Sequence, residues 1–226
     1  MDIQWMKSPN YMSGRAGRKI VAIVNHITAG TFPGCLTWLC NPAAQASAHY
    51  LITRTGEIWQ MVRESDTAWH AGIVKKPTWK LYNGTNPNRY TIGIEHECIS
   101  GGALTEAQYQ GTLQLQRELC AKYSIPIDRN HIIGHYEINP IDRPGCPGKD
   151  FPWVRLMADL KKKEVEEVAQ EKRIQTLEKV PAYARDFVEQ LVQEGSLVGS
   201  GSGLNLTEDM IRTWMVWEKH LEIEGK

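Results

Sequence analysis

Two histidines and a cysteine in this sequence have the residue types and positions to hold a metal ion. His26 and His135 each end a short apolar run, and Cys146 follows in a loop rich in proline and glycine. Two imidazoles and one thiolate supply three zinc ligands, which leaves a fourth position for water, as in catalytic zinc sites. The spacing alone also fits a second interpretation, in which each histidine is a hydrogen-bonded structural residue at a strand end.

Glu95 is the candidate acid or base. It lies in the run 91–97, where strand alternation places it on the face opposite Ile92 and Ile94. A carboxylate on such a face is either solvated or forms the floor of the metal cleft. In the second case Glu95 would take a proton from metal-activated water and return it to a leaving amine, as in metal-assisted amide hydrolysis.

The elements that position these residues include both strands and helices. The run that ends at His26 has the length of a strand buried on both faces, and Thr55-Gly56 joins two further runs as a hairpin turn. Thr105 is a suitable N-cap for a helix that continues to Tyr123. Together these elements predict an α/β or α+β sheet with helices packed on it. The predicted strands are residues 19–26, 50–54, 57–62, 90–98 and 131–135.

The chain changes character after a first domain, which we assign to residues 1–157. Residues 158–180 are rich in charge, with many opposite charges at four-residue spacing, which is typical of an exposed connecting helix. Residues 181–226 place apolar side chains at helical spacing on two segments, which predicts a small helical hairpin. A module of this size is near the lower limit for independent stability, so we expect it to dock on the first domain, a second copy or a ligand.

Composition excludes several classes of protein. The 226 residues include 26 basic and 26 acidic side chains, and 42% are hydrophobic, as in an ordinary folded protein. The balanced charge argues against a nucleic-acid binder, and the apolar runs are too short to span a membrane. The first residues lack the features of a secretory signal, so we expect synthesis in a cytoplasm. Five scattered cysteines favour reduced thiols or one metal ligand over a disulfide framework.

Several stretches, taken in order, resemble the zinc-dependent N-acetylmuramoyl-L-alanine amidases of the type-2 group, which are related to peptidoglycan recognition proteins. The resemblance covers about residues 15–157. It implies an α/β fold with a mixed central β-sheet flanked by helices, to which this chain adds a small C-terminal helical module. The matching stretches are residues 23–30, 47–52, 56–62, 68–72, 92–95, 134–138 and 146–148.

The resemblance also assigns roles to individual residues. Glu95 matches the catalytic acid/base of the family, and Trp69 and His70 match a pair that lines the substrate groove. The family's third metal ligand is Cys in some members and Asp in others. The residues that match the Zn²⁺ ligands are His26, His135 and Cys146.

Two positions depart from the family pattern. Ala48 stands where some members carry a catalytic Tyr, so Glu95 should take that role alone. Pro144 stands where many members carry a Lys two residues before the third ligand. We expect Arg143, or alternatively Lys149, to supply that positive charge for an oxyanion or the substrate.

Three other histidines have simpler interpretations. His49 alternates with core residues of a strand, and His96 faces away from Glu95, so both are expected to be structural. His131, four residues before His135, is either a partner that orients a metal ligand or a surface residue.

The resemblance implies cleavage of the amide bond between the lactyl group of N-acetylmuramic acid and the L-alanine of the stem peptide in peptidoglycan. We expect a phage or prophage endolysin of a Gram-positive host, favoured as a monomer, which leaves the host cytoplasm through holin-type lesions. It needs neither a nucleic-acid nor a membrane partner. The alternatives are a non-cleaving recognition protein and a cytosolic amidase that recycles muropeptides. The C-terminal module would bind the wall or serve only for docking, with Phe187, Trp214 and Trp217 as stacking platforms or plain core.

Overall fold

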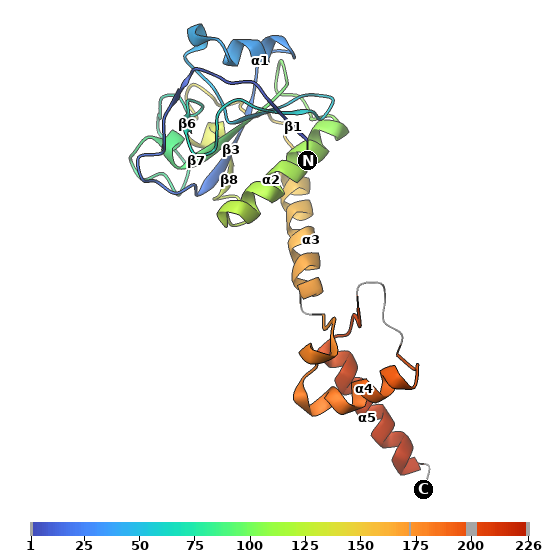
Figure 1. The fold of residues 1–226 in the computed structure, drawn as a ribbon. Helices are drawn as coiled ribbons and strands as arrows, with labels where there is room; N and C mark the ends of the chain where they lie inside the picture. The colour runs from blue at the N-terminus through green and yellow to red at the C-terminus, as the bar shows by residue number, and fades with distance from the viewer. Residues whose placement is uncertain (1, 172, 198–202, 225–226) are drawn as a thin grey trace. The chain divides into compact units, whose positions relative to one another are not determined.

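The computed structural model of the chain describes residues 2–171, 173–197 and 203–224. Contacts within the chain divide it between Lys161 and Lys162 into two compact units (Figure 1). The first unit contains every residue that the sequence assigns to the site. Among the described residues, no helix has both the length and the apolar character that crossing a bilayer requires.

A six-stranded mixed sheet forms the centre of the first unit. The neighbouring strands β4, β7, β3 and β8 run parallel to one another, while β5 is antiparallel to β4 and parallel to the edge strand β1. In spatial order the strands are β1 (Ile3–Trp5), β5 (Ile58–Gln60), β4 (Tyr50–Ile52), β7 (Thr91–His96), β3 (Ala22–Ile27) and β8 (Ile132–Gly134). A separate antiparallel pair consists of β2 (Tyr11–Met12) and β6 (Thr67–Ala68).

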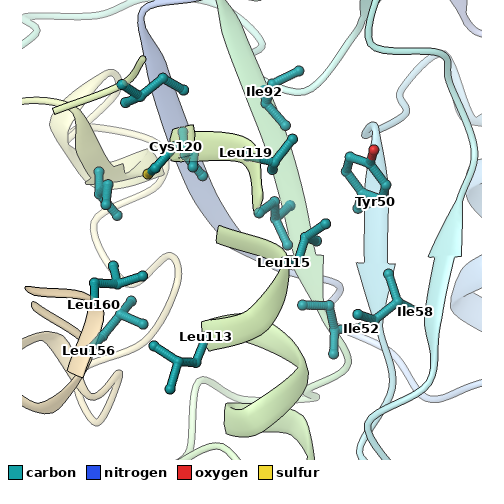
Figure 2. Close-up of a cluster of buried hydrophobic side chains, with 14 of the residues drawn as sticks. Tyr50, Ile52, Ile58, Ile92, Leu113, Leu115, Leu119, Cys120, Leu156 and Leu160 are labelled. Carbon is teal, nitrogen blue, oxygen red and sulfur yellow. The ribbon is translucent and has the colours of Figure 1, made fainter. Parts of the chain in front are cut away.

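Helices cover one face of this sheet and bury its apolar side chains. Helix α2 (Glu106–Tyr123) begins at Thr105, whose hydroxyl accepts a hydrogen bond from the Gln108 amide. Figure 2 shows Leu115 and Leu119 of α2 against strand residues such as Ile92, all of them buried. The first turns of α3 (Trp153–Glu171) add Leu156 and Leu160 to the same cluster. Full burial of each such side chain contributes about 1.5–3 kcal/mol to folding.

The opposite face of the sheet carries helix α1 (Gly34–Leu39) and several loops. Leu51 and Val24 face this side, because they alternate with neighbours that face α2. The short 3-10 helices are η1 (Pro42–Ala44), η2 (Pro87–Arg89), η3 (His135–Glu137), η4 (Leu177–Lys179) and η5 (Ala182–Ala184). The loops on this face, together with α1, supply the remaining walls of the site.

The predicted mixed sheet with flanking helices is confirmed, including the hairpin of β4 and β5 and the helix capped by Thr105. Strand β8 ends at Gly134, one residue earlier than expected, and His135 opens a 3-10 helix instead. The sequence patterns did not predict β1, β2, β6 or α1. The three strands are only two or three residues long, so they carry no usable periodicity.

The second unit has its own small core around helices α4 (Arg185–Gln193) and α5 (Glu208–Glu224). Helix α3 ends at Glu171, so the connecting helix is shorter than the predicted linker 158–180. The last part of that range joins the second unit because its apolar side chains are buried there. The buried residues are Ile174, Val180, Ala184, Val188, Leu206 and Ile211, with Phe187 and Trp214 packed against them. The side chain of Trp217 lies outside the described residues.

Candidate metal centre and active site

The two central strands carry the site on one face. In the parallel pairing of β3 and β7, His26 lies directly beside Glu95. Asn25 points to the other face, where its side-chain oxygen accepts a hydrogen bond from Gln116 of α2 at 2.7 Å. Ile94 likewise joins the core under α2. Strand alternation therefore puts an imidazole and a carboxylate side by side on the face that α2 does not cover.

The structure brings together the three predicted metal ligands. Pairing of β3 with β8 sets Asn25 opposite Gly134, so the next residues, His26 and His135, are neighbours. Their Nδ1 atoms are 3.0 Å apart, and Cys146 Sγ is 4.0 Å from Nδ1 of His26. Each of the three residues offers one ligand atom, and these three atoms all lie within 4.8 Å of one another. All three side chains are buried.

Hydrogen bonds fix the loop that carries Cys146. The Tyr136 amide donates to the Cys146 carbonyl at 3.0 Å, and the Cys146 amide donates to the Arg143 carbonyl at 3.2 Å. Glu137 accepts from the Gly134 amide at 3.1 Å and pairs with Arg129 at 2.5 Å. The backbone of Cys146 is thus tied to Tyr136, which lies two residues after the end of β8.

Burial shifts the ionisation of all three ligands. It lowers the pKa of His26 well below the usual range and that of His135 to about 4, so both imidazoles are neutral at neutral pH. Burial, together with the nearby Glu95, raises the pKa of the Cys146 thiol to about 12. Neutral imidazoles are ready ligands, whereas the thiol must release a proton when a metal binds.

The donor set fits a zinc ion. His135 Nε2 donates to the Ala71 carbonyl at 3.0 Å, which leaves a lone pair on Nδ1, the atom that faces His26. Two nitrogens and one sulfur are the ligands of many zinc sites, and three protein ligands leave one coordination position for the reaction.

Glu95 is a desolvated carboxyl group beside this cluster. Burial raises its pKa to about 8, against a smaller opposing effect of Arg143. Its Oε2 atom is enclosed and has no hydrogen-bond partner among the described residues. A carboxyl group that ionises near neutral pH and is not engaged elsewhere is suited to exchange protons as a general acid and base.

The ligands and Glu95 open into a cavity of about 580 Å³, which is a typical size for a small-molecule site. Trp69 and Arg143, which the sequence assigns to substrate binding, both line this cavity, and Lys149 is not among its lining residues. His70 also lines the cavity, but it is only 6% exposed, and both its ring nitrogens contact protein groups.

Trp38 of α1 is a lining residue that the sequence analysis missed. Its side chain is 55% exposed although it is a large aromatic ring. Its position in a short helix without a clear pattern gave no signal. An exposed indole at the wall of a cavity offers an apolar platform for a ligand.

The remaining histidines and cysteines lie outside the cluster. His49 is buried and accepts a hydrogen bond from the Gly93 amide at 3.0 Å, and His96 contacts Thr112 of α2 at 3.1 Å, so both are structural as predicted. His131 pairs with Asp128 at 2.8 Å, which matches its surface interpretation. All five cysteines lie in the described part of the chain, and none of them forms a disulfide.

Known amidases resemble this chain in sequence. The profile of the family described as N-acetylmuramoyl-L-alanine amidase matches residues 16–149. N-acetylmuramoyl-L-alanine amidase A of Achromobacter lyticus is 33% identical over 165 residues, which cover 65% of this chain and 85% of that protein. The 1,6-anhydro-N-acetylmuramyl-L-alanine amidase AmpD of Salmonella typhimurium is 41% identical over 115 residues, which cover 50% of this chain and 57% of that protein.

A solved structure gives the same result. The amidase AmiD from Escherichia coli, in complex with anhydro-N-acetylmuramic acid-L-Ala-D-gamma-Glu-L-Lys, is 28% identical, with a TM-score of 0.53. The match covers 76% of this chain and 70% of that one. More than half of the sequence matches the family profile, and the fold agrees. The chain therefore belongs to the N-acetylmuramoyl-L-alanine amidase family and is an amidase.

Proposed function

We propose that this chain is a zinc-dependent peptidoglycan amidase that cleaves the bond between the lactyl group of N-acetylmuramic acid and L-alanine. The observation that carries the proposal is the cluster of His26, His135 and Cys146 next to a desolvated Glu95, at the base of an open cavity. Cys146 favours an enzyme over a recognition protein, because it completes a set of three ligands.

The chemistry that zinc supplies when bound to these ligands is that of a Lewis acid, which polarises a carbonyl oxygen and acidifies water. In its ionised form Glu95 accepts the proton of the attacking water, and it lies beside His26 in the strand register. It then delivers that proton to the alanine nitrogen as the amide bond breaks. A single positioned acid/base of this kind contributes about 10²–10⁴-fold in rate.

Aromatic and charged side chains in the cavity suit the two parts of a muropeptide. Trp69 and Trp38 line the cavity, and an indole ring offers an apolar surface on which a sugar or lactyl group can pack. The Trp69 backbone is fixed by Ser47, whose hydroxyl accepts its amide hydrogen at 2.9 Å. Arg143 is exposed in the loop before Cys146 and places a cation where a stem-peptide carboxylate or an oxyanion would lie.

Labelling of new amino termini tests this proposal. After incubation with purified muropeptide, the wild-type protein should release a peptide whose free amino terminus is alanine, together with an intact lactyl carboxylate on the sugar. Release of a different amino terminus, or cleavage between sugars, would place the protein in another class of wall hydrolase.

The wall itself is the substrate that we favour, and an endolysin of a Gram-positive host is the role. The second unit supports this choice, because it has its own buried core and a small soluble substrate needs no accessory module. On this proposal the enzyme accumulates in the host cytoplasm, reaches the wall through membrane lesions, and binds it through the second unit.

Recycling of soluble anhydro-muropeptides is the second candidate, favoured by the 41% identity to AmpD. Parallel assays on intact sacculi and on a soluble anhydro-muropeptide separate the two. An endolysin should solubilise sacculi, whereas a recycling enzyme would cleave only the soluble compound.

A further inference from the structure

We infer that Thr91 and His70 are positioning residues that fix the proton of His26 on Nε2, so that its Nδ1 lone pair faces the metal position. The inference rests on the metal site of the proposed function, but it concerns which ring nitrogen of the ligand carries the hydrogen and not the reaction itself. Neither residue is among the metal ligands, and Thr91 is completely buried on β7.

The carbonyl oxygen of Pro87 can only accept a hydrogen bond. Thr91 Oγ1 lies 2.8 Å from the Pro87 oxygen, so its one hydroxyl hydrogen is donated there. The same Oγ1 lies 3.1 Å from Nε2 of His70 and must therefore accept, which places the His70 hydrogen on Nε2. With its one ring hydrogen on Nε2, the imidazole of His70 carries a lone pair on Nδ1.

The contact between His70 and His26 then fixes the tautomer of the metal ligand. His70 Nδ1 lies 3.0 Å from Nε2 of His26 and can only accept, so His26 carries its hydrogen on Nε2. Nδ1 of His26 is then unprotonated and faces the equally unprotonated Nδ1 of His135 at 3.0 Å. Two lone pairs that converge at this distance repel each other unless a cation lies near both. The hydrogen bonds that fix these tautomers therefore prepare the site for a metal.

A single segment sets the tautomers of both histidine ligands. His70 orients His26, and the carbonyl of the adjacent Ala71 accepts from Nε2 of His135 at 3.0 Å. The Asn88 side-chain oxygen accepts the amide hydrogens of both residues, from His70 at 3.1 Å and from Ala71 at 2.7 Å. The segment is therefore anchored by its backbone, independently of the rings.

Gly93 provides the space for this arrangement. It lies on the same face of β7 as Thr91, and a Cβ atom at Gly93 would stand 2.3 Å from Cγ of His70. Any larger residue would displace the imidazole ring from its contacts with Thr91 and His26. On this face of β7, Thr91 thus orients His70, Gly93 leaves space for its ring, and Glu95 transfers the proton.

The test compares two buried threonines that make the same contacts. Thr112 Oγ1 also donates to a carbonyl, that of Gln108 at 2.8 Å, and lies 3.1 Å from Nε2 of a histidine, but that residue is His96 on the α2 face. Thr91→Val should weaken zinc binding, measured by chelator competition on the full chain, by about 10–100-fold. Thr91→Ser, which keeps the hydroxyl, and the control Thr112→Val should both bind zinc as the wild type does.

Nitrogen-15 NMR of the metal-free protein gives a readout independent of activity. The wild type should show His26 protonated at Nε2 only, and Thr91→Val should populate the Nδ1-protonated form. A wild-type His26 protonated at Nδ1, or equal zinc affinity in Thr91→Val and Thr112→Val, would overturn the inference even in an active amidase. If the variants differ as expected but peptidoglycan is not cleaved, the proposed function fails and the inference stands.

Discussion

Glu95 and Glu97 are two carboxyl groups on one segment that differ in their hydrogen-bond partners. Glu97 is buried and accepts hydrogen bonds from the amides of Phe32 at 2.9 Å and Arg54 at 2.7 Å, so it ties three stretches of chain together. Glu95 faces the metal cluster, and among the described residues its enclosed Oε2 has no partner. The difference in surroundings, rather than in residue type, makes Glu95 available for proton transfer.

Glu95→Gln should lower kcat/KM for amide cleavage by about 10²–10⁴-fold, because the amide side chain cannot accept a proton. The zinc content of the digested protein, measured by elemental mass spectrometry, should stay at the wild-type level, since Glu95 is not assigned as a ligand. A Glu95→Gln protein that retains zinc and most of its activity would refute the assigned role.

Cys146→Ala should abolish stoichiometric zinc binding and activity together, because two imidazoles alone form an incomplete site. Cys146→Asp should retain zinc, since a carboxylate is also a zinc ligand. Cys40→Ala serves as the control, because this thiol lies away from the cluster and donates to the Met6 carbonyl. Equal zinc content in Cys146→Ala and Cys40→Ala would remove Cys146 from the ligand set.

At the residue scale, the sequence predicts what local patterns can show. His26, Glu95 and Cys146 stand in short stretches whose residue types suffice to mark them. The contacts of His70 could not be predicted, because they join residues 44 and 21 positions apart in the chain. Thr91 was equally hidden, since a threonine in a strand is ordinary until its neighbours are known.

At the scale of elements, hydrogen bonds from several segments converge on Glu64, in the loop between β5 and β6. Burial of this carboxyl opposes ionisation, but hydrogen bonds from Lys122, Tyr123 and Tyr50 outweigh it and hold its pKa below the usual value. Lys122 and Tyr123 end helix α2, and Tyr50 begins β4. One carboxylate thus links the end of the main helix to the sheet.

Glu64→Gln should therefore reduce the free energy of unfolding at pH 7 by about 1.5–3 kcal/mol, the range for hydrogen bonds to a charged group. A carboxyl whose pKa is lowered by folding stabilises the protein above its unfolded pKa, and this contribution disappears as pH falls through the folded pKa. The deficit of the variant, measured by urea unfolding, should thus shrink below about pH 4.

The exposed Glu57→Gln provides the control and should change stability by less than about 0.5 kcal/mol. If Glu64→Gln showed a deficit that did not change between pH 7 and pH 3, the stabilisation would not depend on the charge of Glu64.

Long elements were predictable and short ones were not. Strands β3 and β7 are six residues each and α2 is eighteen, so their apolar patterns are clear in the sequence. Strand β1 has three residues and gains its place by pairing with β5, a contact between distant parts of the chain. The end of α3 at Glu171 was also missed, because the charged pattern continues beyond it while the apolar residues of the next stretch join another core.

At the scale of the whole molecule, the chain consists of two units with separate cores. A chain that ends at Lys161 should cleave a soluble muropeptide with unchanged kcat/KM, because all residues of the cavity lie in the first unit. On intact sacculi it should lose about 10²-fold or more in activity, as attachment to the wall raises the effective concentration of the enzyme. If the shortened chain still sediments with cell walls as the full chain does, wall binding by the second unit is wrong.

The most direct test of the central claim is mass spectrometry of the products released from purified Gram-positive peptidoglycan. The full chain is assayed as prepared, after removal of metal with a chelator, and after zinc is restored. We predict free stem peptides that begin with L-alanine, lost with the chelator and recovered with zinc. Intact glycopeptide without a new amine, from a protein that holds zinc at His26, His135 and Cys146, would contradict the account.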